Sequence, residues 1–256
     1  MRSTLKLFII TFAFLIMSIP AEARTPTWAK DGIIIHAAGG IDNTTYTNSL
    51  DALKLTLDKK QKVIELDFSF TKDGVLVCTH NDVSNINIDE FLSKKIKGKF
   101  TPMTAKDALK KLVKSKHTYL VVDVKENDIT NVYKEINNIC KTLGYSGRKY
   151  RKMIIPQLYN INDYKKVTSI YKYRHYIFSM YKMGKLNKKK YKKVASFCEY
   201  NNIKTITIPK KYVNKKTITI FKKYGLTVAT HTVNNYDEYQ DFKNIGVDVI
   251  YTDFLY

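Results

Sequence analysis

The sequence predicts a (β/α)8 TIM barrel, and two observations favour this fold. Short apolar, β-branched segments alternate with longer amphipathic, lysine-rich segments from residue 32 to the C-terminus of the 256-residue chain, without a Pro/Ser-rich linker. Eight of the short segments have the composition of strands, and most are followed by a helical pattern. That number and order suit one such barrel. An open, doubly wound sheet is the alternative α/β fold.

The expected strands are β-branched or aromatic runs, at 32–36, 63–70, 119–125, 153–158, 176–179, 205–209, 227–233 and 247–252. The expected helices lie between them, at 48–57, 105–113, 129–143, 162–171, 188–201, 215–224 and 237–244. Several follow Asp, Asn or Thr, which are good N-cap residues, and Gly144 and Gly225 stand where a helix should stop. A further run, 75–79, follows the Lys72-Asp73-Gly74 turn and is expected to pair as a hairpin arm.

Residues 1–23 have the pattern of a cleaved secretory signal peptide. Arg2 and Lys6 precede an uncharged apolar run at 7–17, and Ala21-Glu22-Ala23 supplies the small residues that a signal peptidase requires. The run is shorter than the roughly 20 apolar residues of a membrane-spanning helix. We therefore expect one mature domain, 24–256, that is secreted or periplasmic, with retention as an N-terminal anchor as the alternative.

The chain is strongly basic, with 44 Lys and Arg against 23 Asp and Glu and a net charge of +21. The excess is spread over helical stretches that interleave lysines with tyrosines, such as 188–193, and does not form one basic arm. This pattern speaks against nucleic acid as a partner and is typical of a solvated lysine-rich face. An anionic membrane or wall polymer is the other partner that such a surface suits. The oligomeric state is not indicated.

Three cysteines, Cys78, Cys140 and Cys198, are widely separated. They lack the spacing of a zinc site or a CxxC redox motif, and an odd number allows at most one disulfide. We expect them to be buried thiols.

An acidic pair marks the second expected strand. In Glu65-Leu66-Asp67, the two-residue period of a strand places both acids on the same face. Such a pair alone is typical of a salt-bridged or solvated strand edge. On the inner face of a barrel, however, two neighbouring acids repel each other and lose solvation, and a bound divalent cation would offset both costs.

The next strand adds Asp123 and, two residues later on the same face, Lys125. Oxygen ligands from Glu65, Asp67 and Asp123 suit one hard cation, Mg²⁺ or Ca²⁺, better than zinc. Lys125 would bring positive charge to a phosphate bound at that cation.

Two histidines stand at strand ends near these acids. His36 closes the first strand and precedes Ala37-Ala38-Gly39-Gly40, small residues that would leave room for a ligand, and His80 follows the 75–79 run. Each histidine alone is typical of a structural residue. Beside three acids and a lysine at one rim of the barrel, the two indicate a general base and a general acid, because imidazole titrates near neutral pH.

Taken together, these residues resemble the glycerophosphodiester phosphodiesterase family, within the superfamily of phosphatidylinositol-specific phospholipase C. The resemblance covers residues 33–254. His36 resembles the histidine of the family's HRG motif, Glu65 and Asp67 resemble its ExD metal ligands, and residues 71–74 resemble its TxDG turn. His80 resembles the second histidine of the family, and Asp123 with Lys125 resembles an acid-x-Lys pair. Near the C-terminus, 232–234 resembles WTVN and 252–254 resembles TDxP.

The resemblance implies a phosphoric diester hydrolase on a (β/α)8 barrel that cleaves glycerophosphodiesters or related glycerol-phosphate compounds. It implies that the three acids hold one divalent cation, that Lys125 assists, and that His36 and His80 act as base and acid in an order that the sequence leaves open. The nucleophile is either water or a neighbouring hydroxyl of the substrate.

Three departures from the family motifs predict an altered specificity. Ala37 replaces the arginine of HRG, Asn48 in Thr47-Asn48-Ser49 is taken to replace the glutamate of ENT, and His231 replaces the aromatic residue of WTVN. We expect His231, Asn48 and Gln157 to bind substrate, the last because it lies near the end of another strand.

Two other functions stay open at this point. One is a phospholipase D-like enzyme that acts on intact lipids, with the Lys- and Tyr-rich surface docked on an anionic membrane. The other is a non-catalytic protein that binds an anionic wall or capsule polymer through its basic surface.

Overall fold

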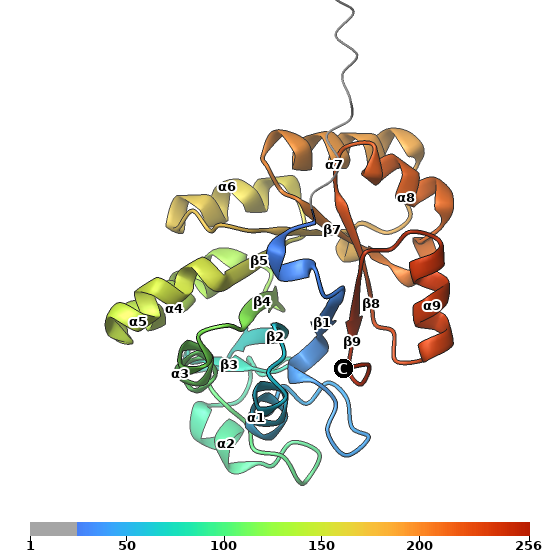
Figure 1. Cartoon of the computed structure of the whole chain (residues 1–256). Coiled ribbons are helices and arrows are strands. Elements are labelled where there is room, and N and C mark those ends of the chain that lie inside the picture. The colour runs from blue at the N-terminus through green and yellow to red at the C-terminus, as the bar shows by residue number, and fades with distance from the viewer. Residues whose placement is uncertain (1–24) are drawn as a thin grey trace, which may run out of the picture.

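The structure, a computed structural model, describes residues 25–256, so the expected signal peptide at 1–23 lies outside the described residues. Eight parallel strands form a closed barrel (Figure 1). They are β1 (Ile33–Ile35), β2 (Val63–Phe70), β4 (Tyr119–Val124), β5 (Ile154–Leu158), β6 (Ile177–Ser179), β7 (Thr205–Pro209), β8 (Thr227–His231) and β9 (Val249–Thr252). Strand β1 pairs in parallel with both β2 and β9, which closes the sheet. The predicted (β/α)8 barrel is confirmed.

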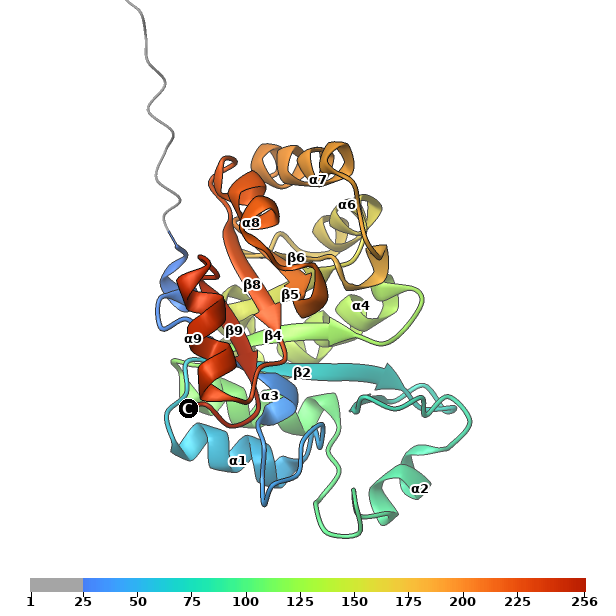
Figure 2. The ribbon, with the colours of Figure 1, turned by 90° about the vertical axis from the view of Figure 1, so that its right-hand side faces the viewer.

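The helices lie around the outside of the barrel (Figures 1 and 2). They are α1 (Leu50–Asp58), α2 (Ile88–Ser93), α3 (Ala105–Ser115), α4 (Ile129–Thr142), α5 (Gly144–Tyr150), α6 (Ile161–Ile170), α7 (Lys188–Tyr200), α8 (Lys215–Lys222) and α9 (Tyr236–Asn244). All except α2 and α5 begin after a Ser, Thr, Asp or Asn whose side chain accepts a hydrogen bond from the first turn. The seven predicted helices are therefore confirmed.

The structure adds short elements to the predicted ones. Gly144 adopts φ +70° and ends α4, as predicted, but α5 begins at the same residue. Helix α2 places Phe91 in a small cluster with Val77 and Val83. Strand β3 (Leu76–Cys78) pairs antiparallel with β2, so the predicted hairpin arm is confirmed.

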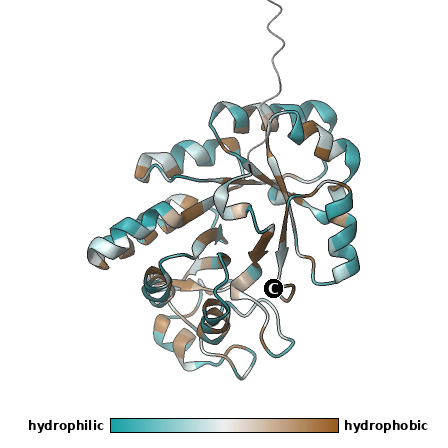
Figure 3. Ribbon diagram, in the orientation of Figure 1, coloured by the Kyte–Doolittle hydropathy of each residue, from teal (hydrophilic) through white to brown (hydrophobic). Residues whose placement is uncertain are grey.

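The two faces of the strands divide the core into an outer and an inner part. On β2, Leu66 and Phe68 belong to the outer cluster, which also contains helix residues such as Leu109 and Val132. In Figure 3 much of the strand ribbon is brown, whereas the helices carry much teal. The inner cluster includes Trp28, Ile34 and Val121. The three cysteines are buried and free, as expected. Among residues 25–256, no helix combines the length and apolarity that a membrane crossing requires.

Candidate active site

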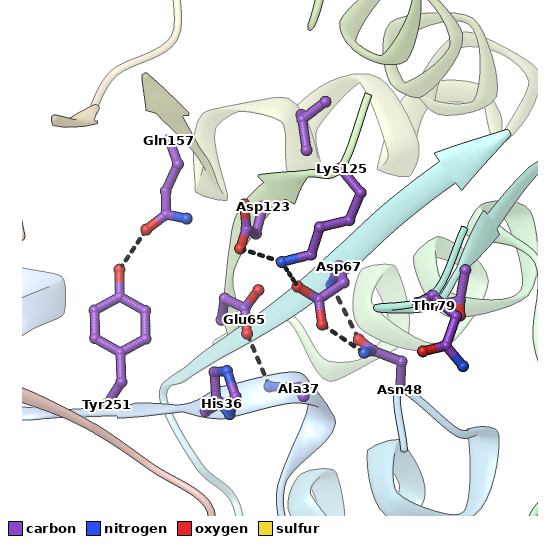
Figure 4. A network of polar contacts seen from close by, with 12 residues as sticks. His36, Ala37, Asn48, Glu65, Asp67, Thr79, Asp123, Lys125, Gln157 and Tyr251 are labelled. Carbon is purple, nitrogen blue, oxygen red and sulfur yellow. Dashed lines mark hydrogen bonds and ion pairs between the residues drawn. The ribbon is translucent and has the colours of Figure 1, made fainter. Parts of the chain in front are cut away.

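Three carboxylates meet inside the barrel toward the carboxyl ends of β2 and β4 (Figure 4). The parallel register pairs Asp67 directly with Asp123, and Glu65 lies one inward position before Asp67. One oxygen from each acid lies within 4.8 Å of the others. Glu65 and Asp67 are buried, with 1% and 0% of their surface exposed. The strand period thus brings the three predicted ligands together.

Lys125 lies between two of these acids. Its Nζ is 2.7 Å from Oδ1 of Asp67 and 2.9 Å from Oδ2 of Asp123. Burial alone would lower the pKa of Lys125, but the attraction of the carboxylates, Asp123 first, raises it above its ordinary value. The lysine therefore stays charged, and one ammonium faces three carboxylates.

The charged form of Glu65 is disfavoured by this arrangement. Burial first, and then repulsion from Asp67 and Asp123, raises the pKa of Glu65 well above its ordinary value. Its Oε2 accepts the backbone N–H of Ala37 at 2.8 Å, whereas its buried Oε1 has no hydrogen-bond partner among the described residues. An unpartnered carboxylate oxygen in a negative cluster fits a hard divalent cation, so the three acids could hold one.

Tyr159 supports the acids from the loop after β5. Its hydroxyl donates a hydrogen bond to Oδ1 of Asp123 and accepts the backbone N–H of Val124 at 3.0 Å. Burial would raise the pKa of Asp123, but Lys125 and this hydroxyl lower it below its ordinary value. No motif in the sequence singled out Tyr159, because its role depends on the pairing of β4 with β5.

His36 lies in a short 3-10 turn directly after β1 and is held by Asp253. The register Ile35↔Thr252 makes the next residue of each strand adjacent, and His36 Nδ1 lies 2.9 Å from Oδ1 of Asp253. Asn234 donates to the other carboxylate oxygen at 2.7 Å. A carboxylate partner places the proton on Nδ1 and leaves Nε2 as the basic nitrogen. The sequence motifs contained Asp253 and Asn234 but assigned neither a role.

The small residues after His36 serve chain packing. A Cβ at Gly40 would lie 2.0 Å from the ring of Phe254, and one at Gly39 would lie 2.3 Å from the hydroxyl of Tyr256. The expectation that these glycines leave room for a ligand is wrong, because the chain after β9 fills the space. That packing holds the β1 end against the segment that carries Asp253.

His80 lies on the open side of the site. The backbone N–H of Thr79 donates to the carbonyl of Asp67 at 3.0 Å, which fixes this chain end beside the acids. Tyr46 stands between the two histidines, with its ring centroid 4.6 Å from that of His36 and 5.0 Å from that of His80. No sequence motif pointed to Tyr46, which comes from the loop between β1 and α1.

The residues predicted to bind substrate have different surroundings from those expected. Asn48 is fully buried, and its side chain donates to Oδ2 of Asp67 at 2.7 Å and accepts the backbone N–H of Asp67 at 3.0 Å. Asn48 is thus bonded to the acid cluster and has no surface exposed to an open pocket.

Gln157 is also tied to the protein. Its Oε1 accepts the hydroxyl of Tyr251 at 2.9 Å, and its Nε2 lies 3.5 Å from the hydroxyl of Tyr159. Only 1% of its surface is exposed, and Gln157 connects Tyr251 to Tyr159, whose hydroxyl bonds to Asp123.

His231 lies among aromatic rings at the end of β8. Its ring centroid is 3.8 Å from that of Tyr181, 4.8 Å from that of Tyr251 and 6.3 Å from that of His36. Burial first, and then the neighbouring His36, lowers the pKa of His231 to about 3. The imidazole is therefore neutral at physiological pH, and its Nε2 has no hydrogen-bond partner among residues 25–256.

Residues 39–256, which carry the acids, Lys125, His80 and Asp253, match the Glycerophosphoryl diester phosphodiesterase family. The chain belongs to this family. It is a phosphoric diester hydrolase, and the resemblance drawn from the motifs is confirmed. Among curated proteins, none matches the sequence.

Solved structures of similar fold come from several organisms. A glycerophosphodiester phosphodiesterase from Parabacteroides distasonis is 19% identical with a TM-score of 0.65, over 88% of this chain and 94% of that one. A phosphodiesterase from Oleispira antarctica, in complex with the product sn-glycerol-3-phosphate, is 15% identical with a TM-score of 0.69, over 87% and 92%. One from Thermotoga maritima is 17% identical with a TM-score of 0.62, over 87% and 94%. At these identities the likeness shows the fold shared with the family.

Proposed function

We propose that this site makes the protein a metal-dependent phosphodiesterase of glycerophosphodiesters or related glycerol-phosphate compounds. The convergence of Glu65, Asp67 and Asp123 within 4.8 Å carries the proposal. A divalent cation, Mg²⁺ or Ca²⁺, held by these acids would offset the charge that develops on the phosphate. The sn-glycerol-3-phosphate bound by the Oleispira antarctica enzyme supports the choice of substrate class.

Lys125 would contribute a fixed charge to phosphate binding. Its ammonium is held by two carboxylates at 2.7 and 2.9 Å and is a quarter exposed. A charge that is already oriented stabilises a developing oxyanion without reorganisation during the reaction. Substrate binding would therefore shift Lys125 only slightly, from the acids toward a phosphate oxygen.

His36 is the better candidate for the base. Its Nδ1–H is bonded to Asp253, so Nε2 can take a proton from the nucleophile, which is water or a substrate hydroxyl. The carboxylate then stabilises the imidazolium. The nucleophilic oxygen bonds to phosphorus, the bond from phosphorus to the leaving alcohol breaks, and His80 gives its proton to the departing oxygen. His80 suits the acid role because it is exposed and lies toward the open side of the site.

His231 and Tyr181 would form one wall of the substrate pocket. Their rings, tilted by 50° with centroids 3.8 Å apart, present a neutral surface, which suits the glycerol part of a diester better than a charged group. Gln157 and Asn48 would keep the neighbouring acids and Tyr251 in place.

The test is a panel of phosphodiesters with identification of each product, run with and without a chelator. We expect glycerophosphodiesters to be cleaved, activity to be lost on chelation, and Mg²⁺ or Ca²⁺ to restore it. Full activity after exhaustive chelation would refute the metal role. A cyclic phosphate among the products would identify a substrate hydroxyl as the nucleophile.

One observation favours a second candidate, a phospholipase D-like activity on intact lipids. Tyr46, Tyr181 and Phe254 expose 45%, 43% and 40% of their surface near the strand ends that carry the site. Exposed aromatic side chains of this kind enter lipid interfaces. Turnover of lipid in vesicles, compared with turnover of water-soluble diesters, decides between the two substrates.

We further propose that residues 1–23 export the protein to a secreted or periplasmic location. The n-region, the apolar run and the small residues at 21–23 support this. N-terminal sequencing of the protein from its native host should begin near residue 24, and an intact N-terminus in the cytoplasm would contradict it.

A further inference from the structure

A groove lined by lysines lies between α7 and α8, outside the acid cluster. It has a volume of about 820 Å³, and seven lysines line it together with Tyr191, Tyr212 and Tyr224. Figures 1 and 2 both show the two helices side by side. No Asp or Glu is among the lining residues that the structure describes.

The lysines of this groove have no acidic partner within residues 25–256, where none of the seven forms an ion pair. Lysines just beside the groove do, since Lys210 pairs with Glu238 and Lys222 with Asp248. Like charges around one concave surface repel each other and create a positive potential that attracts anions.

The groove starts at the rim of the barrel that carries the site. Its first lysines, Lys185 and Lys211, follow β6 and β7. Tyr181, four residues before Lys185, contacts His231 with the ring centroids 3.8 Å apart. From Lys215 to Lys223 it extends along α8, about 12 Å at 1.5 Å per residue. An anionic chain held in the active site could therefore continue into the groove.

The shape and chemistry of the groove favour a linear polyanion over a membrane. Lysine ammonium groups bind phosphates as point charges. A lipid surface would also need exposed apolar side chains to insert. None of the large hydrophobic residues that are exposed in the described part of the chain lines the groove. We propose that this groove binds the phosphates of a linear polymer of repeating phosphodiesters while one of its ends or links occupies the active site. This inference rests on the proposed phosphodiesterase function.

The test compares two variants of the full chain. The groove variant replaces four exposed lysines, Lys188→Gln, Lys192→Gln, Lys215→Gln and Lys216→Gln. The matched control replaces four exposed lysines of α3, Lys106→Gln, Lys110→Gln, Lys111→Gln and Lys114→Gln, so both lose the same charge. Circular dichroism and thermal melting establish that both are folded.

The measurements are the dissociation constant for a poly(glycerol phosphate) chain under chelation, and kcat/KM for that polymer and for a monomeric glycerophosphodiester. For the groove variant we expect polymer binding weaker by about tenfold, from four lost ion pairs of a few tenths of a kcal/mol each. Its binding should also depend less on salt, and kcat/KM for the monomer should be unchanged. The control should bind like the wild type.

Equal losses in the groove variant and the control, or unchanged polymer binding, would overturn the proposal. The proposal would also be overturned if the groove variant lost binding to phosphatidylglycerol vesicles but still bound the polymer, because the groove would then contact a membrane. Absence of monomer turnover by the wild type would instead refute the proposed catalytic function, while the binding measurement would still decide the groove.

Discussion

Replacing Asp253 by Asn tests whether His36 acts as the base. The carboxylate lies 2.9 Å from Nδ1 of His36, and only 7% of the His36 side chain and 1% of the Asp253 side chain are exposed. When His36 takes a proton, this contact becomes a charge-assisted hydrogen bond worth about 1.5–3 kcal/mol. Its loss corresponds to a fall in kcat of roughly 10- to 150-fold.

The amide adds a second effect. An Asn side chain can donate to Nδ1, which moves the imidazole proton to Nε2 and removes the base. We therefore expect kcat for a monomeric diester to fall by at least about 10-fold. KM should change little, because Asp253 is 1% exposed and both of its carboxylate oxygens are bonded, to His36 and Asn234.

The control is Asp248→Asn, which removes a carboxylate that accepts the backbone N–H of Val228 at the start of β8, at the other end of the barrel. It should cost stability without lowering kcat per folded molecule. A wild-type kcat in folded Asp253→Asn would refute the reasoning, as would a loss fully explained by the unfolded fraction.

Three further outcomes follow from the site. His80→Ala should lower kcat by about 10²-fold on an alkyl diester but much less on a p-nitrophenyl diester, whose leaving group needs no acid. His36→Ala should be slow on both substrates. The reverse pattern would show that His80 is the base and His36 the acid. Glu65→Gln should raise the melting temperature of the metal-free protein at neutral pH, because a carboxylate whose pKa is raised in the fold stabilises only below that pKa. The same change should remove the stabilisation by Mg²⁺ or Ca²⁺. A lower melting temperature of the metal-free variant would contradict the burial argument. The pKa of His231 is lowered from 6.5 to about 3, so the wild type should lose stability as pH falls from 6.5 toward 3. In urea unfolding, His231→Phe should lose less free energy of unfolding than the wild type between pH 7 and pH 4. Equal losses would show that His231 is not buried as described.

The periodic parts of the fold and site were predictable from the sequence. The two-residue period of β2 places Glu65 and Asp67 inward regardless of what surrounds them, and the parallel register then sets Asp123 beside them. The helices were predictable because each longer one has a capping residue and an apolar stripe.

The contacts between distant segments were not predictable in this way. Asp253 reaches His36 across 217 residues, and Tyr159 reaches Asp123 across 36. No local pattern assigns a partner to such residues, since an Asp at a strand end or a Tyr in a loop is common. The bonds of Asn48 to Asp67 could not be predicted for the same reason, because the two residues become neighbours only in the folded barrel.

Enzymatic turnover should depend on the pairing of β1 with β9 more than on any other strand pair of the barrel. The imidazole and its carboxylate stand on opposite sides of the junction between these two strands, so any opening there separates them even if every other strand stays paired. Inactivation by heat or denaturant should thus precede the loss of helical signal, and a ligand that clamps the two strands together should protect turnover more than it protects the fold as a whole.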